Sequence, residues 1–220
     1  MAETEEKLKP MAVGSLCRDS YKFYIPYYQR GYRWRKCQVD NLLNDIAEFL
    51  RLCEDKNFLT SCSGNDIYYS LQPLVVRYKN NRWTVIDGQQ RLTTIDLLLE
   101  EISRRLDRPA NEKHKRIISA YRYLSGMEAS CESPLPACTE QRDRIAGALT
   151  EFIERQGLRE DLAAQTFLRA FETCIHERVS IRRVVIPLSD KVENEAPAMF
   201  EIINMRGQQL SVLDILKSRL

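Results

Sequence analysis

The segment Ile86-Asp87-Gly88-Gln89-Gln90-Arg91 concentrates residues that can bind a phosphate group. It follows an apolar stretch that predicts a strand, and a helical pattern begins inside it. Amide N–H groups at the start of a helix have no partner within the helix, so they attract anions. Gly88 allows a tight turn and a close backbone approach, and Arg91 can donate two hydrogen bonds to a phosphate. Thr93 and Thr94 add hydroxyl groups in the expected first turn.

Asp87 adds a carboxylate to this segment. A carboxylate beside a phosphate site usually serves a metal ion, a ribose hydroxyl or an attacking water. The segment alone leaves another interpretation open, because short motifs match by chance. In that interpretation Asp87 and Gly88 form a turn, Arg91 makes a surface ion pair and the glutamines are solvated.

Two further segments carry residues of the same kind. Residues 24–34, which follow an expected strand in the sequence, are rich in tyrosine and arginine and include Trp34. This composition is suited to stacking and phosphate binding. The alternative is a loop packed by its tyrosines. Residues 200–210 end a helix with Asn204, Arg206 and Gly207, which is also the pattern of a glycine-terminated helix with a cationic last turn.

The elements that position these segments follow from periodicity and turn residues. Residues 73–78 and 82–86 flank Asn80-Asn81 and predict a β-hairpin, whose second strand leads directly into the signature. Other expected elements are a strand at 21–25, helices near 37–55 and 89–106, a buried strand at 184–188, and helices at 196–205 and from 211.

We therefore predict an α+β fold, with a small mixed β-sheet and packed helices. One domain is expected, with residues 1–110 as the first part of the core and 111–180 as a mostly helical insertion or subdomain. Residues 181–220 supply the return strand and helices that complete the core. Because the sequence ends within a helical pattern, we expect the natural chain to continue past Leu220.

Composition limits the function classes. The chain has 33 basic and 31 acidic residues, and its net charge of +2 is too small to indicate nucleic-acid binding by itself. Seven cysteines without a C-x-x-C pair indicate neither a disulfide framework nor a zinc site. Neither a signal peptide nor a stretch of membrane-spanning length is visible, so we expect a cytoplasmic protein without a membrane partner.

Taken together and in this order, three motifs resemble the amino-terminal domain of GmrSD-type restriction endonucleases. They are Tyr-x-Ile-Pro-x-Tyr-Gln-Arg-Gly-Tyr-x-Trp, Val-Ile-Asp-Gly-Gln-Gln-Arg-Leu-Thr-Thr and Phe-Glu-x-Ile-Asn-x-Arg-Gly-x-x-Leu. The resemblance spans residues 8–220 in layout, but its specific motifs lie in 24–34, 85–95 and 198–217. The middle third of the chain carries none of them.

The resemblance implies a fold similar to the ParB and sulfiredoxin group, with a nucleotide pocket beside a helical portion. It also implies hydrolysis of a nucleoside triphosphate that controls a nuclease directed at modified phage DNA. The hydrolytic centre would comprise Asp87, Gln89, Gln90 and Arg91, with magnesium at Asp87. The expected nucleotide contacts come from the aromatic segment, the turn and the 200–210 segment. They are Gln29, Arg30, Trp34, Gly88, Thr93, Thr94, Asn204, Arg206 and Gly207.

The nuclease of such systems is usually a His-Asn-His domain, and the only histidines here are His114 and His176. We therefore expect that domain, and contact with DNA, in another part of the same protein or in a partner chain. A homodimer is left open.

An alternative function is a non-hydrolytic module that senses a nucleotide, or binds DNA as ParB-like domains do, and switches a partner. A nuclease activity of this domain itself is disfavoured, because no acidic cluster at two-metal spacing lies near the signature. A basic stretch that suits DNA or a solvated helix comprises Arg104, Arg105, Arg108, Lys113, Lys115 and Arg116.

Overall fold

In a computed structural model, the described residues are 10–17, 23–26, 32–54, 67–79, 82–108, 117–122, 128–130, 136–158 and 162–185. The expected contacts Gln29, Arg30, Asn204, Arg206 and Gly207 lie outside these ranges, as do the helices expected at 196–205 and from 211. The α+β class is confirmed, because a mixed sheet and several helices share one hydrophobic core. Among the described residues, no helix has both the length and the apolar character that a membrane span requires.

Eight strands of the described chain form one sheet in the order β1-β8-β4-β5-β2-β6-β7, with β3 also paired to β8. Strand β4 is antiparallel to β5 and parallel to β8, while β2 lies parallel to both β5 and β6. The pairs β1–β8 and β6–β7 are antiparallel. The strands are β1 (Pro10–Ala12), β2 (Phe23–Ile25), β3 (Tyr69–Ser70), β4 (Leu74–Lys79), β5 (Arg82–Asp87), β6 (Ile118–Arg122), β7 (Glu128–Ser130) and β8 (Val179–Val185).

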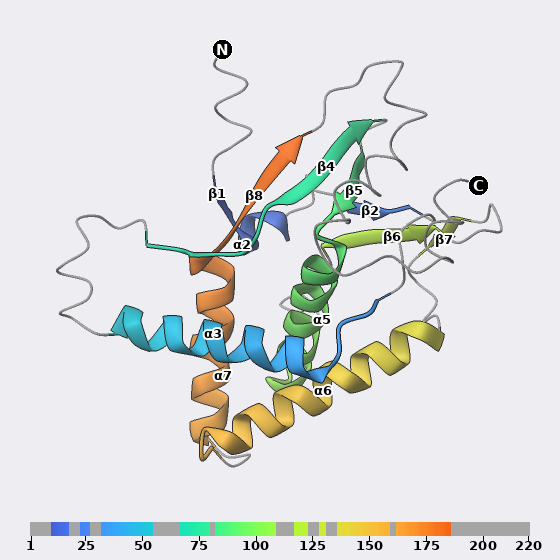
Figure 1. Cartoon of the computed structure of the whole chain (residues 1–220). Coiled ribbons are helices and arrows are strands. Elements are labelled where there is room, and N and C mark those ends of the chain that lie inside the picture. Colours follow the sequence, from blue (N-terminus) through green and yellow to red (C-terminus); the bar gives the residue numbers. More distant parts are fainter. Residues whose placement is uncertain are drawn as a thin grey trace.

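The longer helices gather beneath the sheet in the view of Figure 1. Helix α5 contacts α6 and α7, and α3 packs against the same two helices. Most of α5 is buried, since leucines and isoleucines recur around it at helical spacing. The helices are α2 (Val13–Leu16), α3 (Lys36–Glu54), α5 (Gln89–Arg105), α6 (Pro136–Arg155) and α7 (Leu162–Arg178).

The hairpin of β4 and β5 and the helices α3 and α5 lie where the periodicity predicts them. The described part of residues 111–180 is mostly helical, in α6 and α7, as expected, but β6 and β7 also extend the sheet there. The start of β6 is fixed by a distant residue: the Ile117 amide donates to the buried Asp96 carboxylate of α5 at 2.8 Å. Such a long-range partner leaves no local pattern.

The strand expected at 184–188 begins earlier than its sequence suggests. Helix α7 ends at Arg178 and β8 begins at Val179, so no turn residue separates the two elements. The buried part of β8 lies at its start, whereas Val184 is 38% exposed. The apolar run that predicts the strand therefore lies at its more open end.

Candidate functional site

The turn between β5 and α5 requires glycine. Gly88 has φ +95° and ψ 6°, a left-handed conformation that residues with a side chain rarely adopt. A Cβ at this position would lie 2.7 Å from Leu74 Cδ1 and 3.1 Å from Arg91 Nη2. The glycine thus permits both the chain reversal and the close packing of the turn against β4.

The amino end of α5 carries the positive end of a helix of 17 residues. Gly88 has no side chain with which to cap the helix, and the first turn contains no acidic residue. The carboxylate nearest in sequence is Asp87, immediately before the turn. This is the local arrangement that the sequence predicts for an anion site.

Arg91 joins the start of β4 to this turn. Its guanidinium donates to the Pro73 carbonyl at 3.0 Å, to Asp87 Oδ2 at 3.3 Å and to the side-chain oxygen of Gln72. Burial lowers the pKa of the Arg91 guanidinium, although the charge of Asp87 opposes that effect. Its side chain is 13% exposed, so a phosphate that bound Arg91 would compete with partners already in place.

Asp87 offers a carboxylate that is partly open. Its side chain is 33% exposed, Oδ2 accepts from Arg91, and no described residue bonds Oδ1. The described part of the chain contains no group of three or more His, Cys, Asp or Glu placed to hold a metal ion. One carboxylate nevertheless fits magnesium that arrives with a nucleotide, because phosphate oxygens and water then supply the other ligands.

The two glutamines of the signature differ in their surroundings. The Gln90 side-chain oxygen accepts from the backbone N–H of Arg33 at 2.6 Å and of Trp34 at 3.3 Å. Gln89 is 6% exposed, and its side-chain oxygen is buried without a hydrogen-bond partner. A buried amide oxygen without a donor is costly, so Gln89 lies where a ligand donor would be favourable.

Thr93 and Thr94 lie in the second turn of α5 and are both buried. The Thr94 hydroxyl donates to the Gln90 carbonyl at 2.8 Å and lies 2.8 Å from the Tyr32 hydroxyl. Burial raises the pKa of Tyr32, and the hydrogen bond with Thr94 partly offsets that rise. Thr94 therefore holds the Tyr32 hydroxyl by a hydrogen bond, and its side chain is too buried to contact a ligand.

Trp34 lies beside the same end of α5 and packs against the core. Its backbone carbonyl accepts from Arg144 Nη1 of α6 at 2.7 Å. The structure thus brings the Trp34 backbone to the first turn of α5, through the Gln90 side chain.

Sequence analysis alone missed four residues that shape this region: Tyr32, Gln72, Asp96 and Arg144. Tyr32 lies inside the aromatic segment and could have been named from it. Arg144 gave no signal, because its partner lies 110 positions earlier in the chain.

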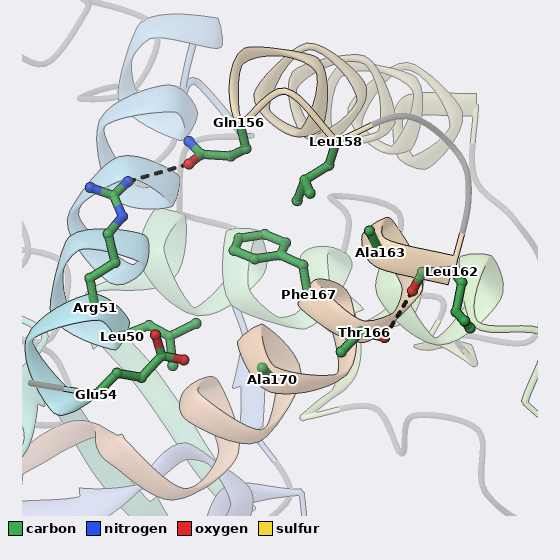
Figure 2. A pocket seen from close by; sticks show the side chains of 10 residues that line it. All are labelled: Leu50, Arg51, Glu54, Gln156, Leu158, Leu162, Ala163, Thr166, Phe167 and Ala170. Atoms are coloured by element: carbon green, nitrogen blue, oxygen red, sulfur yellow. Dashed lines mark hydrogen bonds between the residues drawn. The ribbon is translucent and has the colours of Figure 1, made fainter.

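A hollow of about 880 Å³ lies elsewhere, between the ends of α3 and α6 and the start of α7. Figure 2 shows Phe167 and Leu158 facing into it, with a 3.3 Å hydrogen bond from Arg51 to Gln156 at its edge. Of the residues expected at the nucleotide site, none that the structure describes lines this hollow. Its lining comprises Leu50, Arg51, Glu54, Gln156, Leu158, Leu162, Ala163, Thr166, Phe167 and Ala170.

Comparison with known proteins connects the site to a family. Residues 13–220 match the family described as GmrSD restriction endonuclease, N-terminal domain. The match includes the middle third of the chain, where the sequence carries no specific motif. Among curated proteins, no significant match is found.

Proposed function

Because the chain belongs to the family of GmrSD restriction endonuclease N-terminal domains, we propose that its Gly88 turn binds and hydrolyses a nucleoside triphosphate. The family places the chain in DNA restriction and defence against phage. Nucleotide hydrolysis would control the nuclease of that system. The observation that carries this proposal is the turn itself, with a left-handed glycine, the amino end of α5 and the partly open Asp87 carboxylate.

In the proposed reaction, water attacks the terminal phosphorus, and the bond from that phosphorus to the oxygen joining it to the next phosphate breaks. The products are the nucleoside diphosphate, inorganic phosphate and a proton. Asp87 Oδ1 would hold magnesium or orient the water, and the Gln89 amide, which has an unpartnered oxygen, would help to position it. Asp87 would hold the magnesium, which would supply positive charge to offset that of the phosphate groups. Arg91, together with Arg30, would offset the charge that develops on the phosphoryl oxygens.

Phosphate release from each of the four triphosphates, measured with magnesium, tests the proposal. Asp87→Asn keeps the shape of the side chain and removes its charge, so turnover should fall by about 100-fold or more. Turnover of Arg91→Ala should also fall. Arg104→Ala is the matched control, because Arg104 is 69% exposed and pairs with Glu101 away from the turn. Turnover of Asp87→Asn equal to that of the wild type would exclude the assignment.

The second candidate is a domain that binds the nucleotide without hydrolysing it. The bonds of Arg91 to Gln72 and Pro73 favour it, because a guanidinium already held by the protein is less free to follow a reacting phosphate. Saturable triphosphate binding without phosphate release would select this candidate.

Direct DNA binding through the basic stretch gains little support from the described residues. Arg105 pairs with Glu101 at 2.7 Å, and Arg108 pairs with Glu172. These two arginines bind carboxylates within the fold, so they are less free to bind phosphates. We propose that DNA is contacted by the complete protein or by a partner that carries the nuclease.

A further inference from the structure

Residues Tyr32–Arg35, here called the anchored segment, form neither helix nor strand yet are held at both sides. On the α5 side, the Tyr32 hydroxyl lies 2.8 Å from Thr94 Oγ1. Two backbone amides of the segment donate to the Gln90 side chain. On the α6 side, Arg144 donates to the Trp34 carbonyl at 2.7 Å. The segment thus joins the amino end of α5 to a helix from the middle third of the chain.

The environment of Gln90 differs from that of a group poised to act on a ligand. Its side-chain oxygen accepts two backbone amides, and the residue is only 9% exposed. An oxygen engaged in this way has little capacity left to orient a water. Gln89, with its unpartnered oxygen, is the glutamine that remains suited to a ligand.

Arg144 holds the segment from the opposite helix. Nη1 bonds the Trp34 carbonyl, while Nη2 bonds Glu140 one turn earlier on α6 at 2.9 Å. Its side chain is 30% exposed and lies close enough to Tyr32 for its charge to lower the pKa of that phenol, against the larger effect of burial. The bond to Glu140 on the same helix therefore orients the Arg144 guanidinium toward the anchored segment.

We infer that Gln90 and Arg144 are positioning residues that hold the anchored segment beside the amino end of α5 and thereby set the affinity for the triphosphate. This inference rests on the proposed function of the Gly88 turn. The Trp34 backbone is held beside the first turn of α5 by its bonds to Gln90 and Arg144, so its indole is available to stack on a nucleotide bound there.

The first experiment needs no nucleotide. The chain has two tryptophans, so a Trp83→Phe background leaves Trp34 as the only indole emitter. Gln90→Met and Arg144→Met should each shift Trp34 emission to the red and increase its quenching by acrylamide. The matched controls are Gln156→Met and Arg142→Met, because Gln156 bonds Arg51 and Arg142 pairs with Glu100, both away from the segment. Far-UV circular dichroism verifies the fold of each variant.

The second experiment measures binding and turnover in the same variants. Loss of either anchor should weaken triphosphate binding by about 10-fold. Arg144→Met should also leave kcat near the wild-type value, since Arg144 lies on α6 and is not part of the expected hydrolytic centre. Gln90→Glu retains both acceptor bonds and should preserve the emission of Trp34.

Several results would overturn the inference. Unchanged Trp34 emission in both methionine variants refutes the anchoring. A fall in kcat confined to Gln90→Met, with KM unchanged, makes Gln90 catalytic and refutes its positioning role. A wild-type chain that binds no triphosphate overturns the proposed function and the claim on affinity, while Trp34 emission still decides whether the segment is anchored.

Discussion

Gly88→Ala tests the geometry of the turn most directly. The backbone at φ +95° costs a residue with a Cβ about 1–2 kcal/mol. The added carbon would also lie 2.7 Å from Leu74 Cδ1 and 3.1 Å from Arg91 Nη2, an overpacking that costs about 1–3 kcal/mol. Together these effects should lower the free energy of unfolding by about 2–5 kcal/mol, a large part of the roughly 5–15 kcal/mol of a typical domain.

Two other glycines separate the contributions. Gly157 has φ +71°, and a Cβ added there would meet open space, so Gly157→Ala should show the conformational cost alone. Gly147 lies inside α6 with open space around it, so Gly147→Ala should stabilise the helix by up to about 1 kcal/mol. Urea unfolding followed by tryptophan fluorescence measures all three variants. If Gly88→Ala lost no more stability than Gly157→Ala, the close packing against Leu74 and Arg91 would be refuted.

Three further predictions concern stability and reactivity. Thr94→Val should lower the free energy of unfolding by about 1–3 kcal/mol, because the partly buried Tyr32 hydroxyl loses its partner. Thr94→Ser should restore most of this stability in urea unfolding. Burial alone raises the pKa of Glu101, but hydrogen bonds from two arginines of the same helix lower it below the ordinary 4.5. The stability that Glu101 contributes is thus present above pH 4.5 and is lost as the pH falls through the lowered pKa. Glu101→Gln should therefore flatten the acid side of a plot of unfolding free energy against pH, and an unchanged plot would contradict this. Burial raises the pKa of the Cys17 thiol to about 12, so iodoacetamide at pH 8 should modify the exposed Cys37 well before Cys17, as peptide mass spectrometry would show; equal rates would contradict the buried position.

Local patterns predicted those parts of the structure that local chemistry determines. The β4–β5 hairpin follows from two apolar runs around Asn80-Asn81, and α5 follows from helical spacing after Gly88. The family was also predicted correctly, because three motifs in a fixed order are far more specific than any one of them. Nucleotide hydrolysis stays a prediction.

The roles of individual side chains were less predictable, because they depend on partners far away in the chain. Nothing in the sequence distinguishes Gln89, with its unpartnered oxygen, from Gln90, which holds two backbone amides. Thr94 is typical of a phosphate contact by position, but its hydroxyl is used by Tyr32. Arg144 becomes visible only when α6 is packed against the segment that contains Trp34.

The parallel pairing of β4 with β8 has a consequence for synthesis on the ribosome. Leu74 of β4 lies opposite Arg183 of β8, which is synthesised much later. The hairpin of β4 and β5 can therefore form early, while the β4 edge stays unpaired until β8 is made. Until β8 emerges, that edge has unpaired backbone groups and can recruit another nascent chain. Expression at reduced temperature, or with a chaperone that shields strand edges, should therefore raise the yield of correctly assembled domain.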